Sequence, residues 1–193
     1  MVFPGVYREN ITLRPGVRLV SAEPHKAVIE APGIIVSGVG TSGATLAGFR
    51  LVSPRREPAD VAVQVEGGVV ELVNLEIRGM RRAAVELTGD GSTVLKNSTL
   101  ADNPGSGLIV SGKGTPVIEG NMLLRNGRRP GDPRPAIEIR DTAQPVLRGN
   151  TLNLSGAEEI WAHPLFDTAA ALRQNKVGRS RQDNGRKVKV LTD

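Results

Sequence analysis

Short apolar stretches recur along this chain at nearly regular intervals. In each of them, Val, Ile, Leu and Ala alternate with polar residues, and Gly, Pro, Asn or Asp stands at the ends. This pattern is typical of β-strands, and the stretches are too short for helices. One set of such strands is predicted at 61–65, 84–87, 107–110, 136–139 and 158–162.

A second set of stretches forms an internal repeat. Residues 116–124 and 145–152 share nearly the same sequence, and 92–100, 70–77, 44–51 and 170–177 align with them without gaps. One marker position of the aligned unit is occupied by Gly48, Asn74, Asn97, Asn121, Asn150 and Asn175, at spacings of 26, 23, 24, 29 and 25 residues. Such a period indicates stacked coils, with no room for a crossover helix. The prediction is one all-β domain over 1–193, a single-stranded parallel β-helix of about seven coils of roughly 24 residues.

The marker asparagines have a structural explanation. A tight bend between strands favours a residue that tolerates a left-handed backbone, and Asn does so better than any residue except Gly. Asparagines in register can also stack, each amide donating to the next. We therefore interpret Asn74, Asn97, Asn121, Asn150 and Asn175 as a structural ladder rather than as ligand contacts.

The N-terminal segments 4–13 and 15–20 contain Pro4-Gly-Val-Tyr-Arg-Glu-Asn and Pro15-Gly-Val-Arg-Leu-Val. They resemble the opening coil of the pectate-lyase-like superfamily of right-handed β-helices. The resemblance extends over nearly the whole chain and implies a right-handed helix. It does not imply one activity, because the superfamily contains lyases, hydrolases, esterases, epimerases, tailspikes and non-catalytic modules.

Members of that superfamily usually have a capping helix and strand before this segment. Here Met1 stands three residues before Pro4. We therefore expect either a fragment of a longer protein or an exposed first coil that needs a partner, for example a second copy of the chain.

Composition narrows the range of functions. Gly 23 and Pro 13 suit a turn-rich solenoid, and aromatic residues at 3% leave few rings for stacking on sugars or bases. Nucleic acid is therefore not an expected partner. With Cys 0 there is neither a disulfide nor a thiolate metal site, and no apolar run predicts a membrane span. Residues 1–10 contain no signal-peptide core, and the cellular location stays undetermined.

The positive charge is concentrated at the C-terminus. Residues 176–193 contain six basic and two acidic side chains, so the remaining 19 basic and 18 acidic residues leave the body nearly neutral. We expect this segment to cover the last coil as a strand, with Val188 and Val190 inward and Lys187 and Lys189 outward. A tail that binds a polyanion is the alternative.

No catalytic motif of the superfamily's enzymes is matched, and the eight Asp residues are scattered, so we predict no catalytic residue, metal or cofactor. His163 and Asp167 could meet in one turn, but a single His before Pro is more often a loop residue, and His25 is treated in the same way.

One positive signal appears once the repeats are aligned. Three arginine pairs follow their markers by seven and eight residues, and further arginines follow by four. These candidate ligand-binding residues are Arg55, Arg56, Arg81, Arg82, Arg128 and Arg129, with Arg78, Arg125 and Arg179 along the edge. Pro104-Gly105 interrupts the row. Insertion 126–135 is expected as an extended loop that forms a wall of any groove.

The row has two interpretations. It is a solvated surface neutralised by Glu57, Glu76 or Asp132, or it binds an anionic chain such as a uronate polysaccharide through bidentate arginine contacts. The predicted function is a non-catalytic binding or scaffolding module. A lyase or hydrolase acting on acidic polysaccharide is the first alternative, favoured by carboxylates grouped beside the row, and a structural spacer is the second.

Overall fold

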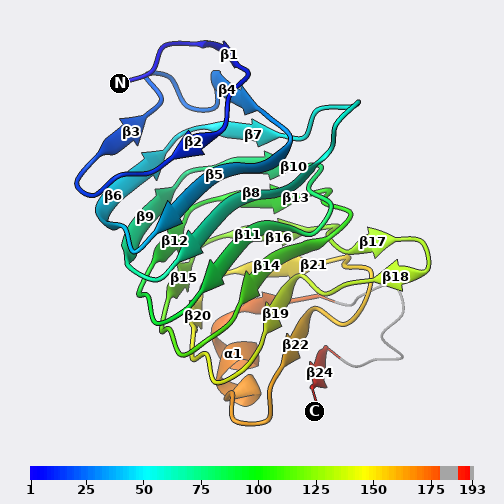
Figure 1. Cartoon of the computed structure of the whole chain (residues 1–193). Coiled ribbons are helices and arrows are strands. Elements are labelled where there is room, and N and C mark those ends of the chain that lie inside the picture. The colour runs from blue at the N-terminus through cyan, green and yellow to red at the C-terminus, as the bar shows by residue number, and fades with distance from the viewer. Residues whose placement is uncertain (179–186, 192–193) are drawn as a thin grey trace.

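The strands wind into coils that stack along one axis. In the computed structural model, which describes residues 1–178 and 187–191, the chain forms an all-β parallel solenoid of about seven coils (Figure 1). Successive coils place strands of like position side by side in parallel, as the repeat predicts.

Three sheets form the sides of the solenoid. The first contains β1 (Gly5–Tyr7), β4 (Ala27–Glu30), β7 (Arg50–Val52), β10 (Glu76–Arg78), β13 (Thr99–Ala101), β16 (Met122–Leu124), β21 (Thr151–Asn153) and β23 (Lys176–Val177). The second contains β2 (Ile11–Thr12), β5 (Gly33–Val39), β8 (Ala59–Glu66), β11 (Ala83–Thr88), β14 (Ser106–Val110), β19 (Ile137–Ile139), β22 (Ile160–Ala162) and β24 (Val188–Val190). The third contains β3 (Arg18–Val20), β6 (Ser42–Ala47), β9 (Val69–Val73), β12 (Val94–Lys96), β15 (Val117–Glu119) and β20 (Val146–Arg148).

Each sheet contributes a row of aliphatic residues to the core, one from each coil. The row of the third sheet is Leu19, Leu46, Leu72, Leu95, Ile118 and Leu147. The row of the first sheet is Ile29, Leu51, Ile77, Leu100, Leu123 and Leu152. Nearly all of these side chains are fully buried. Like residues stacked on like residues fill the interior continuously, which explains a core with so few aromatic rings.

The strand register corrects one step of the repeat alignment. Val94 pairs with Val117, so residue 97 stands opposite residue 120 and not opposite Asn121. The gapless alignment of 92–100 with 116–124 is therefore wrong by one residue. It would have placed Leu95, which is buried, opposite Glu119.

Two different positions are thus occupied by the marker asparagines. Asn74 and Asn97 have φ of 51° and share the left-handed bend with Gly48, Gly120 and Gly149. Asn121, Asn150 and Asn175 lie one position later and are joined by side-chain hydrogen bonds of 3.0 and 2.8 Å, each Nδ2 donating to the next Oδ1. Of the five asparagines predicted as a ladder, only these three are joined in this way.

The repeat does not predict a second stack of buried asparagines, formed by Asn103 and Asn126. Asn103 Nδ2 donates to Asn126 Oδ1 at 2.8 Å, and Asn103 Oδ1 accepts from the backbone N of Met80 at 3.0 Å. Both asparagines are buried, and they follow the left-handed residues Asp102 and Arg125. At the second bend of the coil, the backbone groups do not pair with strands of neighbouring coils. The two asparagines bond some of these groups instead, such as the N of Met80 and the carbonyl oxygen of Leu100.

The last coil differs from the prediction of a strand over 170–177. Helix α1 (Thr168–Gln174) replaces it and packs against β20, and only Lys176 and Val177 continue the first sheet. Asp167 caps the helix by accepting from the backbone N of Ala170 at 2.8 Å. The run Ala-Ala-Ala-Leu-Arg-Gln consists of helix formers, and with an N-cap it prefers the helix over a third short strand.

The insertion after β16 is also more ordered than predicted. Strands β17 (Arg128–Arg129) and β18 (Asp132–Pro133) pair as an antiparallel hairpin, where an extended loop was expected. Pro130 and Gly131 form its turn, with Gly131 at φ 79°. This is the arrangement of a type II turn, in which Pro presets the first corner and Gly supplies the second.

The two ends of the solenoid are different. At the first coil the strands β1, β2 and β3 are the end members of their sheets, and Met1 and Phe3 are exposed by 85% and 71%. At the last coil β24 pairs with β22, and Val188 packs against the core as predicted. Val190 was also expected to point inward, but it is 49% exposed. Lys189 lies 4.3 Å from the ring centroid of Trp161. The basic residues Arg179, Arg181 and Arg186 lie outside the described residues.

Candidate functional site

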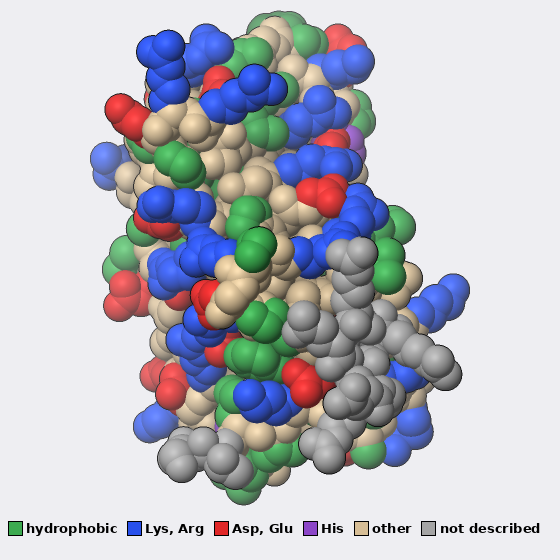
Figure 2. Space-filling view, turned by 90° about the vertical axis from the view of Figure 1, so that its right-hand side faces the viewer, with side chains coloured by type: hydrophobic (Ala, Val, Ile, Leu, Met, Phe, Trp, Pro, Cys, Tyr) green, Lys and Arg blue, Asp and Glu red, His purple; other side chains and the backbone are tan. Residues whose placement is uncertain are grey.

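Basic side chains gather on the side of the solenoid from which the β17–β18 hairpin projects. Figure 2 shows Lys and Arg on this face interleaved with Asp and Glu. The arginines do not form a continuous unpaired row, because carboxylates from neighbouring coils lie between them. They divide into an ion-paired edge, a cavity and a separate depression.

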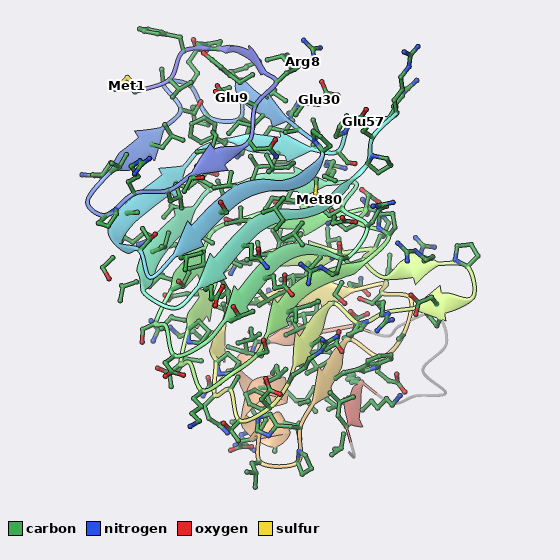
Figure 3. The ribbon with its side chains drawn as sticks, viewed as in Figure 1. Met1, Arg8, Glu9, Glu30, Glu57 and Met80 are labelled. Atoms are coloured by element: carbon green, nitrogen blue, oxygen red, sulfur yellow. The ribbon has the colours of Figure 1, made fainter. Side chains whose placement is uncertain are left out.

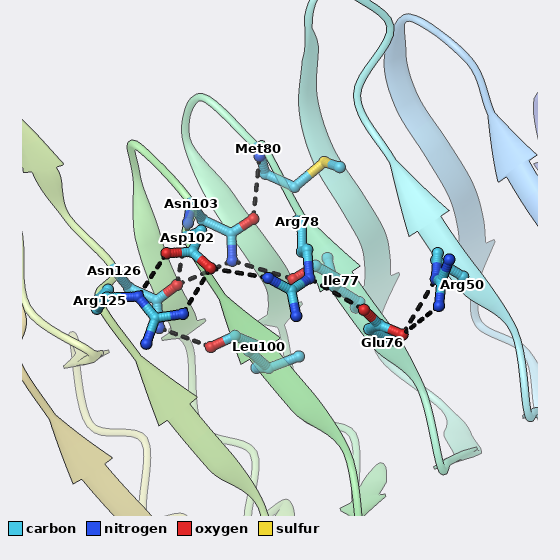
Figure 4. A network of polar contacts seen from close by, with 10 residues as sticks. All are labelled: Arg50, Glu76, Ile77, Arg78, Met80, Leu100, Asp102, Asn103, Arg125 and Asn126. Atoms are coloured by element: carbon cyan, nitrogen blue, oxygen red, sulfur yellow. Dashed lines mark hydrogen bonds and ion pairs between the residues drawn. The ribbon is translucent and has the colours of Figure 1, made fainter. Parts of the chain in front are cut away.

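The edge is a chain of ion pairs across four coils (Figure 4). Arg50 and Arg78 both bind the carboxylate of Glu76, with N to O distances of 3.0 Å. Arg78 also reaches Asp102 at 2.9 Å, and Arg125 binds the same carboxylate through two nitrogens at 2.6 and 2.7 Å. Arg78 and Arg125, predicted as ligand-binding residues, are therefore neutralised within the protein.

The acids of this edge are held in their charged form. Burial opposes ionisation of Glu76, but the hydrogen bonds and charges of Arg78 and Arg50 outweigh it, so its pKa lies below the ordinary value. The hydrogen bond from Arg125 is the largest cause that lowers the pKa of Asp102. That same hydrogen bond raises the pKa of Arg125. The edge is an ion-paired network in which three arginines share two carboxylates.

A cavity of about 380 Å³ lies between the second and third arginine pairs. Its lining consists of Asp60, Arg81, Arg82, Pro104, Gly105, Ser106, Ile109, Arg129, Asp132, Arg134, Glu138 and Arg140. Five arginines thus face three carboxylates, and because Glu86 pairs with Arg82, the formal excess is one positive charge. The hairpin supplies Arg129 and Asp132 as one wall, as expected of the insertion.

The interruption of the arginine row creates the hollow. Arg82 stands opposite Gly105 on the next coil, because Ala83 pairs with Ser106. A Cβ on Gly105 would lie 2.1 Å from the carbonyl oxygen of Arg82, so the chain passes too closely here for any side chain. Pro104, Gly105 and Ser106 have small side chains or none, so they form the floor of the cavity between the longer arginine side chains.

Most charged groups of the cavity are paired in a defined way. Arg81 binds Asp60 at 2.8 Å, and Arg134 binds Asp132 at 2.9 Å. Arg129 donates to the carbonyl oxygen of Arg81 at 2.9 Å, which fixes the hairpin to the coil two turns earlier in the chain. A guanidinium has five N–H donors on more than one edge, so an arginine already bound to a carboxylate can still bind an anion.

The buried carboxylates of this region come from the outer face of the second sheet. Glu86 accepts from Arg82 Nη1 at 2.6 Å and from Gln64 at 3.1 Å. Glu138 is only 4% exposed and binds Arg140 at 2.9 Å. The sequence reasoning found neither pair, although a glutamate interrupts each of the aliphatic stretches 84–87 and 136–139. That interruption was the available signal.

The remaining candidates lie elsewhere. Arg55 and Arg56 are exposed on the loop after β7, beside a depression that also includes Arg8, Glu30 and Glu57, the last three labelled in Figure 3. Arg128 precedes Arg129 in β17 and is exposed, but it does not line the cavity. The structure thus brings Arg81, Arg82 and Arg129 together and leaves Arg55, Arg56 and Arg128 outside.

The two histidines contact the backbone. His25 Nε2 lies 2.9 Å from the carbonyl oxygen of Asn74, and His163 Nε2 lies 2.9 Å from that of Ala143. Asp167, the possible partner of His163, is the cap of α1. Within the described residues no group of three or more His, Cys, Asp or Glu side chains is placed to hold a metal ion.

Comparison with known proteins places the chain in a family. A family model described as a right-handed beta helix region matches residues 33–179, and the chain belongs to this family. No curated protein and no solved structure matches it. Over residues 1–178 and 187–191, no helix has the length and apolar character to cross a membrane.

Proposed function

We propose that this protein is a non-catalytic binding module that holds an acidic polysaccharide in the cavity beside the β17–β18 hairpin. The observation that carries the proposal is the convergence of five arginines on one cavity with an excess of positive charge. Planar guanidinium groups match the geometry of carboxylates and bind them in a bidentate manner. A chain of uronic acids presents such carboxylates at regular spacing.

The arrangement of the acids supports binding over metal-assisted cleavage. Asp60 and Asp132 are each held by an arginine and do not cluster to bind a cation. Calcium-dependent chemistry needs several carboxylate oxygens around one hard cation.

The test compares two double variants with equal loss of charge. Arg81→Ala/Arg129→Ala removes two arginines of the cavity, and Arg55→Ala/Arg56→Ala removes two exposed arginines outside it. Binding of polygalacturonate fragments is measured by calorimetry at low and moderate salt. We expect the cavity variant to lose at least about tenfold in affinity, since each charge-assisted hydrogen bond contributes roughly 1.5–3 kcal/mol. The control should stay within about threefold. Equal losses in both variants, or no binding by the wild type, would contradict the proposal.

A second function, cleavage of the same polysaccharide, is favoured by one observation. Carboxylates do lie beside the arginines, and Glu138 is buried at the cavity wall. Release of new reducing ends or of unsaturated products from polygalacturonate during a long incubation would establish turnover and replace the binding proposal.

A further inference from the structure

Two buried side-chain oxygens that lack a hydrogen-bond partner belong to residues that line the cavity. They are the hydroxyl oxygen of Ser106 and the Oε2 oxygen of Glu138, and among the described residues no other buried side-chain nitrogen or oxygen shares this condition. The two residues are 1% and 4% exposed. A buried polar atom without a partner is unfavourable, so two of them on residues that line one cavity indicate a place where a ligand atom completes the bonding.

The two atoms stand at different places in the cavity. Ser106 begins β14, and Glu138 lies on the neighbouring strand β19 opposite Ile109. They are therefore separated by three residues along the strand direction, which corresponds to about 10 Å. A single small ion cannot satisfy both, and an extended ligand can.

The chemistry of Glu138 restricts what meets it. Arg140 donates from Nε and Nη2 to the same carboxylate oxygen, Oε1, at 3.0 and 2.9 Å. This holds the carboxylate in place through Oε1, while Oε2 has no hydrogen-bond partner. A carboxylate oxygen only accepts hydrogen bonds, so its ligand partner has to be a donor.

The arginines impose the complementary demand. Guanidinium groups only donate, so they require acceptors and favour a negative charge. A ligand that satisfies the whole cavity therefore carries an anionic acceptor together with a hydroxyl donor. Hydroxylated sugar acids have both. A heavily sulfated chain offers the charge, but its esterified oxygens have no hydrogen to donate to Glu138.

We propose that Glu138 and Ser106 are specificity-determining residues that make the cavity select hydroxyl-bearing carboxylate sugars over sulfated polyanions. This inference rests on the proposed function, because it assumes that the arginine cavity binds an acidic glycan. If these two residues select the ligand, a polymer with more negative charge, such as a sulfated chain, does not bind more tightly than a uronate chain.

The experiment measures a ratio of affinities. Wild type is titrated with polygalacturonate fragments and with dextran sulfate fragments of matched length, and then Glu138→Gln, Ser106→Ala and a control are compared. The control is Glu119→Gln, which changes an exposed carboxylate paired with Arg148 at 3.0 Å, outside the cavity. Thermal unfolding of each variant verifies that it is folded.

We expect wild type to prefer the uronate fragments by about tenfold or more. Glu138→Gln should reduce this ratio at least about fivefold, because Arg140 keeps the amide oxygen and the Nε2 donor then replaces the Oε2 acceptor, and because the charge that repels sulfate is lost. Ser106→Ala should weaken uronate binding by about fivefold, the value of one hydrogen bond near 1 kcal/mol. Glu119→Gln should leave the ratio unchanged.

The failures of the two proposals are distinct. If wild type binds neither polymer, the proposed function is wrong. If it binds both through the cavity arginines with equal affinity, and neither Glu138→Gln nor Ser106→Ala changes the ratio, the function stands and the assignment of these residues is overturned.

Discussion

Asn121 and Asn97 look equivalent in the repeat, yet the structure predicts effects of very different size when they are substituted. Asn121 is 1% exposed. Its Oδ1 accepts from the backbone N of Ser98 at 2.9 Å, and its Nδ2 donates to the carbonyl oxygen of Leu95 at 2.9 Å and to Asn150 Oδ1. Asn97 is exposed and lies at φ 51°, a bend that Gly occupies on other coils.

The magnitudes follow from these contacts. Asn121→Ala leaves the Ser98 amide and the Leu95 carbonyl unpaired in the interior, and each costs roughly 1–3 kcal/mol. We expect a loss of about 4 kcal/mol in the free energy of unfolding, or roughly 10 °C in the melting temperature of a chain of this size. Asn97→Gly relieves the left-handed strain and increases the entropy of the unfolded chain, so its net effect should stay within about 1 kcal/mol.

Urea titration followed by far-ultraviolet circular dichroism measures both variants against wild type. Equal slopes with denaturant verify that the cooperative unit is the same. The reasoning fails if Asn121→Ala costs less than about 1 kcal/mol, or if Asn97→Gly destabilises the protein as much as Asn121→Ala does.

Two further outcomes test the ion-paired edge and the open first coil. The pKa of Asp102 is lowered in the folded state, so its contribution to stability is present at neutral pH and disappears as the pH falls through that lowered value, below about pH 4. Between pH 7 and pH 3, the free energy of unfolding measured by urea titration should therefore fall less in Asp102→Asn than in wild type. The difference between the two falls should not exceed about 1 kcal/mol, because the ion pair is exposed to solvent. If both proteins lose the same stability over this range, the ion-paired edge does not contribute to stability. At the other end, Met1 and Phe3 are exposed beside the edge strands β1, β2 and β3, so they should promote self-association at high concentration, which Phe3→Ser should weaken in sedimentation velocity. A wild type that sediments only as a monomer contradicts this.

Most of the fold follows from the order of residue types. Alternating aliphatic residues bounded by Gly, Pro and Asn define strands, and their recurrence every 23 to 29 residues requires stacking, because one coil cannot bury its own apolar side. The error in register between 92–100 and 116–124 could have been avoided, since it paired the buried Leu95 with Glu119. The aliphatic residues that point inward define the strand register more reliably than the marker Asn, because Asn occupies two different positions at the bend.

The local exceptions depended on competing preferences. The run of helix formers that follows Asp167 forms α1, although it also aligns with the repeat. At the end of a solenoid, helix propensity and the N-cap outweigh the two or three hydrogen bonds that a strand would gain there. Pro130-Gly131 closed a hairpin where only a loop was expected. The sequence shows both features, the capped run of helix formers and the Pro-Gly turn, when these segments are considered apart from the repeat.

The sequence by itself determined a right-handed β-helix and indicated an arginine-rich side. Only the tertiary structure decided which arginines are neutralised, which three of the predicted residues share a cavity, and that Ser106 and Glu138 lack partners there. The physical reason is that several of these ion pairs join neighbouring coils, with partners more than 20 residues apart in the chain, as with Arg81 and Asp60. Such pairings depend on register and on the side to which each residue points, and a shift of one residue exchanges inside for outside.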